Sequence, residues 1–342
     1  MDLKFGIVGS GSWGTALVKI LTDNGHKIHW WVRNKNYGDY ILNRHHHPKY
    51  LSSALLNTQN LQIHQNLSDV VAATNIIIMA MPSAYVADSL SVLDKTAFTH
   101  KKVLSAIKGI LPQENILLNE YLQQYFNFSL QDYFAVLGPC HAEEVAAEKL
   151  SYLTFSGLDE DMAAKIANYF QSPAINTITN HDILGVQYAA VLKNIYALGA
   201  GIAHGLDYGD NFQSVYIANS ADEMAIFLKK FGAEYIVVGE HEAGIKNANY
   251  AASVYLGDLL VTCYSLHSRN RTFGNMIGKG YSVQAAQLEL NMVAEGYNAA
   301  KCIYNINQNV KAEMPITETI YKVLWEGLPP AEGFEIIEKV LV

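Results

Sequence analysis

A glycine-rich hexapeptide near the N-terminus constrains the fold more than any other part of the sequence. It follows the apolar run Leu3–Val8 and opens the helical pattern Ser12–Asn24. Glycines at three of its positions allow a tight strand-to-helix turn, and they let backbone amides approach a pyrophosphate that the helix N-terminus then stabilises. The strand before it and the helix after it are the context that makes such a motif informative. We therefore expect a dinucleotide cofactor to bind at Gly9, Ser10, Gly11, Ser12, Trp13 and Gly14.

Short apolar runs alternate with amphipathic patterns through the first half of the chain. Several runs are nearly continuous in Ile, Val, Leu and Met, which is typical of parallel strands that are covered on both faces. The alternation predicts an α/β fold, with an N-terminal Rossmann-type, doubly wound parallel sheet. The expected strands are Leu3–Val8, Lys27–Val32, Leu61–His64, Asn75–Met81, Lys102–Ile107, Phe134–Leu137 and Tyr152–Phe155.

The pattern changes near residue 181, where long helical segments replace the strands. A chain of 342 residues accommodates about two domains. We predict a dinucleotide-binding domain at residues 1–181 and an all-α domain for substrate binding and catalysis at residues 182–342. Its helices are expected at about Asp182–His204, Phe212–Phe231 and Ala248–His267, with later ones beginning near Ser282, Tyr297, Pro315 and Ala331.

The composition argues against several classes of protein. Lys and Arg number 24 against 32 Asp and Glu, a net charge of −8, so the chain lacks the positive field that nucleic-acid binding requires. Three separated cysteines without a CxxC motif argue against a disulfide scaffold or a structural zinc site. The N-terminus reads as a strand, and the most apolar stretch, Ile76–Met81, is far shorter than the ~20 residues of a membrane span. We expect a cytoplasmic protein without a membrane span, a metal or a nucleic-acid partner.

The residue after the second expected strand indicates the cofactor. An acidic residue there holds the ribose hydroxyls of NAD. This chain has Arg33 instead, and a guanidinium matches a 2′-phosphate through paired hydrogen bonds. Arg33 therefore favours NADPH/NADP over NADH/NAD, and the alternative is a solvated loop charge.

Lys193 lies within the first helix expected in the second domain. At helical spacing it shares a face with the small residues Ala189, Ala190, Ala197 and Ala200. Such a lysine either extends past its small neighbours to solvent or is buried beside a ligand. Burial would lower its pKa and make it a usable proton donor and acceptor near neutral pH.

Further candidates for the site occur at Lys108, Asp258, Thr262 and Arg269. Asp258 and Thr262 are four residues apart and so share one helix face. Arg269 is a candidate phosphate anchor, although an Arg-rich tripeptide also fits an exposed turn. Lys108 follows an expected strand and is placed at the carboxyl edge of the sheet, where open α/β folds bind ligands.

Two other features are interpreted without a catalytic role. Cys140 and His141 are adjacent, and adjacent side chains generally point apart, so we do not expect a nucleophile and its base. The run of histidines at 45–47 is interpreted as a solvated loop rather than a metal site.

Taken together, these residues resemble the soluble bacterial type of NAD(P)-dependent glycerol-3-phosphate dehydrogenase over nearly the whole chain. The matching strings follow the family's order, which makes the resemblance specific. They are Gly9–Ala16, Ile107–Gly109, Gly138–Glu144, Gly185–Gln187, Leu192–Asn194, Leu256–Leu259, Ser268–Arg271, Val293–Tyr297 and Met314–Thr317.

The resemblance implies roles for the matching positions. Lys193 would donate a proton to the carbonyl oxygen of dihydroxyacetone phosphate and accept it in the reverse reaction from sn-glycerol 3-phosphate, with Asn194, Asp258 and Thr262 beside it as catalytic residues. The family also implies a homodimer and a place in glycerophospholipid synthesis. The substrate is expected at Lys108, Gly138, Cys140, Asp258, Ser268, Arg269 and Asn270, and the NAD(P) cofactor, beyond the hexapeptide, at Arg33, Lys108, Ala142, Arg269, Val293 and Glu295.

The sequence departs from the family pattern in four places, one of which is Asn219–Met224, which replaces the usual start of its helix. Cys140 stands where the family usually has Ser or Thr, so a hydroxyl is replaced by a weaker thiol donor. A basic residue is missing near Gln213, and the stretch Gly232–Tyr255 lacks the expected glycine-rich approach to Asp258. We expect these changes to affect substrate affinity and regulation more than the reaction.

Two other functions are compatible with parts of the pattern. A two-domain dehydrogenase of 2- or 3-hydroxy acids would also use Lys193 and Asn194, but a carboxylate substrate leaves the match at Ser268–Asn270 unexplained. A nucleotide-binding regulator without turnover would have lost its catalytic lysine, whereas Lys193 and Lys108 are both present.

Overall fold

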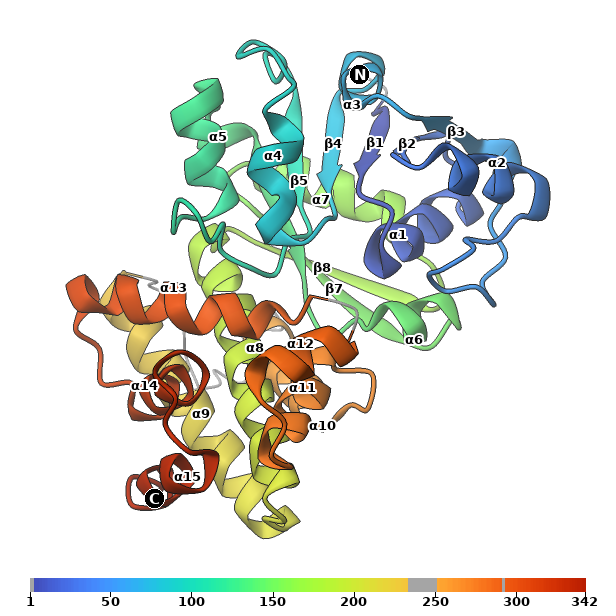
Figure 1. The fold of residues 1–342 in the computed structure, drawn as a ribbon. Coiled ribbons are helices and arrows are strands. Elements are labelled where there is room, and N and C mark those ends of the chain that lie inside the picture. Colours follow the sequence, from blue (N-terminus) through green and yellow to red (C-terminus); the bar gives the residue numbers. More distant parts are fainter. Residues whose placement is uncertain (1–2, 233–250, 291–292) are drawn as a thin grey trace. The chain divides into compact units, whose positions relative to one another are not determined.

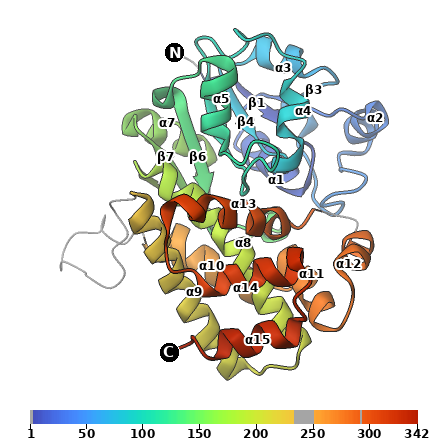
Figure 2. The same cartoon turned by 60° about the vertical axis from the view of Figure 1, so that its left-hand side comes forward.

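The computed structural model describes residues 3–232, 251–290 and 293–342. The chain divides into two compact units (Figure 1, Figure 2). Unit 1 consists of Met1–Ile107 and Ile116–Ile183, and unit 2 consists of Lys108–Asn115 and Leu184–Val342. The segment Lys108–Asn115 lies inside the range 1–181 expected for the first domain, but it belongs to unit 2.

Unit 1 is built on an eight-stranded sheet. In the order in which they pair, the strands are β3 (Leu61–His64), β2 (Ile28–Trp31), β1 (Phe5–Val8), β4 (Ile76–Met79), β5 (Lys102–Ser105), β6 (Tyr133–Leu137), β7 (Ser151–Gly157) and β8 (Ile175–Asn180). Every residue of β1, β4 and β6 is buried, as expected for strands covered on both faces. The predicted Rossmann-type fold is confirmed, with one difference: β6 and β7 pair antiparallel within an otherwise parallel sheet.

Helices pack against this sheet. Helix α1 contacts β1 and β2, and it also contacts α6 and α7, while α3 contacts the strands β1 to β3. The helices of unit 1 are α1 (Ser12–Asp23), α2 (Lys35–Arg44), α3 (Leu67–Ala73), α4 (Val86–Leu90), α5 (Leu118–Phe126), α6 (Ala142–Ala146) and α7 (Glu160–Phe170).

The edge strand β8 was not expected from the sequence. It pairs in parallel with β7, with Thr154 opposite Ile178. Its residues are Ile-Asn-Thr-Ile-Thr-Asn, and only the first and last of them are buried. An edge strand is exposed on one side, so it carries polar β-branched residues instead of the continuous apolar run that marks the central strands.

The C-terminal part of unit 2, from Leu184 onward, is helical over its described residues, as predicted. Figure 2 shows α13 next to α14, and α14 next to α15, in agreement with their contacts. The elements are α8 (Ile183–Gly205), α9 (Asp210–Phe231), a π-helical segment η4 (Ala251–Gly257), α10 (Asp258–Tyr264), α11 (Arg269–Gly278), α12 (Val283–Leu290), α13 (Glu295–Val310), α14 (Pro315–Tyr321), a second π-helical segment η5 (Lys322–Glu326) and α15 (Pro330–Glu338).

Two details differ from the expected helices of unit 2. The helix predicted at Ala248–His267 ends at Tyr264, after which Ser265 is extended, and its residues 248–250 lie outside the described part of the chain. Helix α11 was not expected, because its first residues are polar and were interpreted as a candidate anchor or a turn.

Helix α8 forms the centre of unit 2. Among the described residues it is the one helix long and apolar enough to cross a membrane, and 94% of its most apolar window is buried inside the protein. A core helix of this kind passes the same test of length and composition, so α8 is weak evidence for a span.

Candidate functional site

The glycine-rich hexapeptide connects β1 to α1 in unit 1, and the structure explains two of its glycines. Gly9 has φ +123°, and a Cβ there would lie 2.3 Å from the carbonyl oxygen of Ala80. The buried Trp30 donates a hydrogen bond of 2.9 Å from its indole nitrogen to the carbonyl of Gly9, which fixes the turn. A side chain at Gly9 is therefore excluded by the fold itself.

Gly11 has the opposite surroundings. It is the N-cap residue of α1, no described side chain caps this helix end, and no acidic residue lies in the first turn. A Cβ at Gly11 would meet no atom of the described protein within 4 Å. Open space in front of uncapped helix amides fits the pyrophosphate of a dinucleotide.

Arg33 is exposed two residues after the end of β2. The next residue, Asn34, caps α2, because its side-chain oxygen accepts a 2.9 Å hydrogen bond from the backbone N–H of Asn36. The cap fixes the backbone beside Arg33 and leaves the guanidinium at the carboxyl end of the strand, as the cofactor prediction requires.

The predicted residues Gly138, Cys140 and Ala142 lie between β6 and α6 in unit 1. The thiol of Cys140 is buried and donates to the carbonyl of Gly138 at 3.0 Å. Ala142 is buried and begins α6, and His141 precedes it at the N-cap position without capping the helix. The Cys140 thiol, which stands where the family usually has a hydroxyl, thus donates its hydrogen bond within its own loop.

A buried charge cluster lies in unit 2. The Lys193 ammonium on α8 pairs with Oδ1 of Asp258 on α10, and their side chains are only 3% and 2% exposed. The ammonium of Lys108 lies 3.7 Å from Oδ2 of the same carboxylate and is 23% exposed. Two cations thus share one anion, which leaves a net positive charge in a low-dielectric site. Lys193 is therefore buried and does not extend past its small neighbours to solvent, which was the alternative interpretation.

A chain of carboxamides runs beside this cluster. The backbone N–H of Gly296 donates to Asn270 Oδ1 at 2.9 Å, Asn270 Nδ2 donates to Asn194 Oδ1 at 2.9 Å, and Asn194 Nδ2 donates to the carbonyl of Lys108 at 2.8 Å. A Cβ at Gly296 would lie 2.4 Å from the carbonyl of Asn194, so α13 approaches α8 too closely for any other residue. The chain joins four segments of unit 2 and holds the backbone of Lys108.

The tripeptide Arg269–Arg271 opens α11 instead of forming an isolated turn. Ser268 caps the helix, with its hydroxyl oxygen accepting from the N–H of Arg271 at 3.3 Å. Arg269 is exposed at the first helical position, and Asn270 is buried. The N-terminus of a ten-residue helix, with an arginine beside it, favours an anion such as a phosphate.

Other predicted residues have structural contacts. The hydroxyl of Thr262 is buried and donates to the carbonyl of Asp258 at 2.5 Å, within α10. Gln213 is buried and its amide lies 3.5 Å from the carbonyl of Cys263. Val293 and Glu295 are half-buried around the start of α13. Residues 233–250 of the divergent stretch Gly232–Tyr255 lie outside the described residues.

Arg271 was not singled out from the sequence, and its charge acts on the buried thiol of Cys263, as that of Lys193 does. Burial raises the pKa of the Cys263 thiol to about 12, and the positive charges of Lys193 and Arg271 oppose that rise. Arg271 and Lys193 therefore act on the same buried group. Their positions on α11 and α8 are remote in sequence, so no local pattern connects them.

The interpretation of the histidine run as a solvated loop is wrong for His47. This side chain is fully buried, and its Nδ1 accepts from the N–H groups of Lys49 and Tyr50 at 3.1 and 3.0 Å. Burial lowers its pKa to about 4, and the charge of Lys49 adds to this effect. Among the described residues, no group of His, Cys, Asp and Glu has the arrangement of a metal site.

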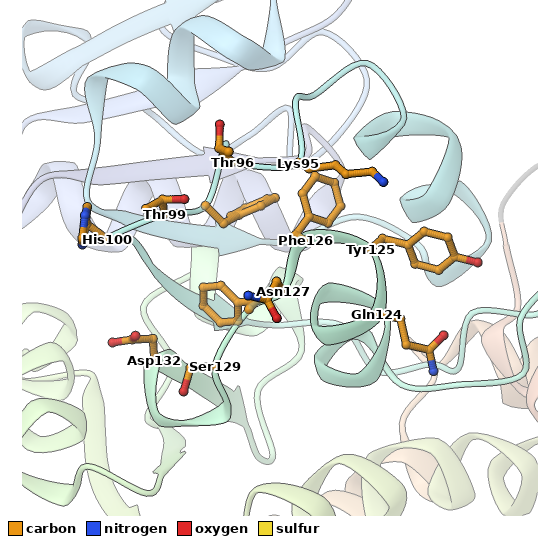
Figure 3. A pocket seen from close by; sticks show the side chains of 12 residues that line it. Lys95, Thr96, Thr99, His100, Gln124, Tyr125, Phe126, Asn127, Ser129 and Asp132 are labelled. Atoms are coloured by element: carbon orange, nitrogen blue, oxygen red, sulfur yellow. The ribbon is translucent and has the colours of Figure 1, made fainter.

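A separate pocket of about 580 Å³ lies in unit 1, and none of the predicted site residues lines it (Figure 3). Phe98, Phe126 and Phe128 line it, and Phe98 packs edge to face on the other two rings. Figure 3 shows the polar ends of Lys95 and Tyr125 pointing away from these rings. None of the predicted catalytic or binding residues lines this pocket, so the charge cluster of unit 2 is the candidate site considered for the reaction.

Comparisons with known proteins show the family to which the chain is similar. Residues 4–163 match the family model of the NAD-dependent glycerol-3-phosphate dehydrogenase N-terminus, and residues 182–335 match that of the C-terminus. The chain is 32% identical to a glycerol-3-phosphate dehydrogenase (NAD(P)+) of Oceanobacillus iheyensis, over 97% of this chain and 92% of the relative. It is 33% identical to the enzyme of the same name from Thermoanaerobacter sp., over 97% and 95%. The crystal structure of glycerol-3-phosphate dehydrogenase from Coxiella burnetii shares the fold, with a TM-score of 0.87, 23% identity and 99% coverage of both chains.

Proposed function

The chain belongs to the NAD-dependent glycerol-3-phosphate dehydrogenase family, and from this premise we propose that Lys193 is the proton donor in the reduction of dihydroxyacetone phosphate to sn-glycerol 3-phosphate. NAD(P)H, when bound, supplies the hydride. Reduction of a ketone builds negative charge on its oxygen, so the site needs a proton donor and a cationic environment at that atom. The observation that carries the proposal is the buried cluster of Lys193, Asp258 and Lys108, which provides both.

Asp258 has two functions in this proposal. Its negative charge offsets the free-energy cost of burying the Lys193 ammonium, and its Oδ1 fixes the direction of that ammonium. Lys108 on the other oxygen leaves the cluster with a net positive charge, which stabilises an alkoxide. In the reverse reaction, Lys193 would accept the proton from the hydroxyl of glycerol 3-phosphate.

The substrate phosphate is proposed to bind at the N-terminus of α11. Ser268, Arg269 and Asn270 occupy this end, where helix amides and a guanidinium favour a dianion. Unit 2 carries most of the residues proposed for the substrate, and unit 1 carries most of those proposed for the cofactor. Within unit 1, Gly9–Gly14 would hold the pyrophosphate and Arg33 the 2′-phosphate of NADPH, with NADH as the poorer cofactor.

The experiment that tests the proposal compares two lysine variants. We expect purified protein to oxidise NADPH when given dihydroxyacetone phosphate, and Lys193→Ala to lower kcat by roughly 100- to 10,000-fold, the usual contribution of a general acid. Lys19→Ala is the matched control, because Lys19 is also largely buried and ion-paired, to Asp23 and Glu148, but lies on α1 in unit 1. NADPH binding should survive in both variants. Near-normal turnover by Lys193→Ala would remove this residue from the proposed role.

We further propose a homodimer in the cytoplasm that supplies glycerol 3-phosphate for glycerophospholipid synthesis. Membership of the family supports this assignment. Light scattering on the purified protein measures its mass in solution, and a fully active monomer would contradict the proposed homodimer.

A further inference from the structure

Glu223 on α9 is a buried carboxylate that the proposed reaction does not use. It is 4% exposed, and none of the ion pairs within the described part of the chain includes it. Its partners are four neutral donors. Oε1 accepts from the hydroxyl of Tyr196 at 3.1 Å and from the N–H and hydroxyl of Thr317 at 2.9 and 2.7 Å, and Oε2 accepts from the N–H of Ile316 at 2.7 Å.

These contacts join three helices of unit 2. Ile316 and Thr317 belong to the first turn of α14, so the carboxylate caps that helix from outside. Tyr196 belongs to α8, three residues after Lys193, which places it roughly one helical turn further along. Glu223 therefore connects the turn that carries the proposed proton donor to α9 and α14.

A second contact ties the same turn of α8 to α9. The hydroxyl of Tyr216 on α9 donates to the backbone carbonyl of Tyr196 at 3.0 Å. Gly199 makes room for it, because a Cβ there would lie 2.1 Å from that hydroxyl oxygen. Both the side chain and the backbone of Tyr196 are thus held.

The carboxylate stabilises α14 as a cap, because it accepts the first-turn N–H groups of Ile316 and Thr317. Burial of a carboxylate without a cation is costly, and these hydrogen bonds offset part of that cost. Burial raises the pKa of Glu223 to about 7, although its hydrogen bonds from Thr317, Ile316 and Tyr196 act in the opposite direction. The bond from Tyr196 connects the same carboxylate to α8, which the cap of α14 does not require.

We propose that Glu223 is a positioning residue: through Tyr196, its carboxylate fixes the turn of α8 that carries Lys193, and so sets where the Lys193 ammonium lies against Asp258. This rests on the proposed role of Lys193 in the reaction. In this proposal Glu223 acts through Tyr196 and not on substrate or cofactor directly.

The ionised and protonated forms of Glu223 hold α8 differently. The N–H groups of Ile316 and Thr317 have fixed directions and always require an acceptor, whereas the hydroxyls of Tyr196 and Thr317 can rotate. The titratable groups that interact with the carboxylate are Tyr196 from α8 and Tyr216 from α9; burial raises the pKa of both well above the ordinary value, so both stay neutral. From α14 it meets only neutral groups. Protonation of Oε1 would turn the charge-assisted bond from Tyr196 into a weaker, neutral one.

The test separates the two helices that Glu223 holds. Tyr196→Phe removes the hydroxyl of α8 that donates to Glu223 and also interacts with Thr317, and Thr317→Val removes one bond to α14 while the bond from Tyr196 to Glu223 stays. Glu223→Gln is an uncharged carboxamide at the same place. For each variant, kcat and KM for dihydroxyacetone phosphate are measured with saturating NADPH above and below pH 7, together with the midpoint of urea unfolding.

We expect Tyr196→Phe and Glu223→Gln to lower kcat by roughly tenfold with little change in KM, since a displacement of about 1 Å at a reacting group costs up to roughly 100-fold. Wild type and Thr317→Val should lose kcat as the pH falls through about 7, and this step should be absent from the other two variants. Thr317→Val should unfold at lower urea and keep the wild-type kcat.

The outcomes distinguish the two proposals. If Tyr196→Phe and Thr317→Val both unfold earlier while both keep the wild-type kcat and its pH profile, Glu223 is only a structural cap and the positioning role is wrong. If Lys193→Ala retains turnover, the proposed function fails, and with it the residue that Glu223 was to position. An inactive Lys193→Ala with an unchanged Tyr196→Phe overturns the positioning role alone.

Discussion

Replacing the first two glycines of the strand-to-helix turn by alanine should separate a glycine that the fold requires from one that the cofactor requires. At Gly9 the backbone has φ +123° and the new methyl would lie 2.3 Å from the carbonyl oxygen of Ala80. The backbone conformation alone costs about 1–3 kcal/mol for a residue with a Cβ, and the overlap with a rigid carbonyl adds to it. Gly9→Ala is therefore expected to unfold at a much lower urea concentration than the wild type.

Gly11→Ala should behave in the opposite way. Gly11 has φ −79° and ψ −175°, an extended conformation that alanine adopts without strain. No described atom lies within 4 Å of the new methyl. Alanine reduces the freedom of the unfolded chain, worth about 0.4–1 kcal/mol, but it is less favourable than glycine at an N-cap, so the free energy of unfolding should stay within about 1 kcal/mol of the wild type.

The cost of Gly11→Ala should appear in cofactor binding. The methyl would enter the space through which a pyrophosphate approaches the amides of α1. Loss of one charge-assisted hydrogen bond is worth about 1.5–3 kcal/mol, which raises the Kd for NADPH roughly 10- to 100-fold. Titration of NADPH fluorescence measures this Kd, and urea unfolding measures the stability of the same samples. A Gly11→Ala protein that binds NADPH as tightly as the wild type would refute the assignment of this turn to the pyrophosphate.

Three further changes have expected outcomes of different kinds. Arg33→Asp should raise KM for NADPH roughly tenfold and bring it towards that for NADH, because a carboxylate repels a 2′-phosphate; an unchanged ratio of initial rates with the two cofactors would mean that Arg33 does not read the phosphate. Asp258→Asn leaves the buried Lys193 without its counter-charge and should cost about 3–5 kcal/mol of stability and most of kcat, whereas Asp132→Asn, in a half-exposed pair with Lys102, should cost less than about 1 kcal/mol. Folding lowers the pKa of His47 from 6.5 to about 4, so the unfolded chain binds the proton first as the pH falls. The free energy of unfolding of the wild type should therefore fall by on the order of 3 kcal/mol between these two pH values. His47→Asn keeps an acceptor but does not titrate, so its free energy of unfolding, measured in urea at each pH, should fall by that much less.

The sequence predicts those parts of the fold in which each segment carries its own signal. The strands β1 and β4 read as strands because they are buried on both faces, and the glycine-rich turn is identified by the strand and helix around it. The strand β8 was missed because an edge strand has polar residues on its exposed side. The helix α11 was missed because its charged first turn was interpreted as a phosphate anchor or an exposed turn. Its buried residues Asn270, Phe273, Gly274 and Ile277 follow the spacing of a helix face, and that pattern would have identified it.

The candidate site was predictable by residue type and not by contact. Motifs selected Lys193, Asp258 and Lys108, but the sharing of one carboxylate by two ammonium groups depends on segments that are far apart in the chain. For His47, contacts from distant segments make a residue buried that its sequence neighbours indicate to be exposed. Its neighbours in sequence are polar, so it was interpreted as solvated, whereas rings from Trp30, Tyr37 and Tyr50 surround it in the fold.

The carboxamide chain shows how a predicted role and an observed contact fit together. The direction of hydrogen-bond donation along this chain is fixed at both ends, because the backbone N–H of Gly296 can only donate and the backbone carbonyl of Lys108 can only accept. Asn270 and Asn194 must therefore each use their oxygen as an acceptor and one hydrogen of their amide as a donor. An amide nitrogen carries two hydrogens, so each side chain keeps one N–H for another acceptor. The substrate role predicted for Asn270 thus needs no rearrangement: the same side chain can hold Lys108 in place through Asn194 and donate its second hydrogen to a phosphate at the N-terminus of α11.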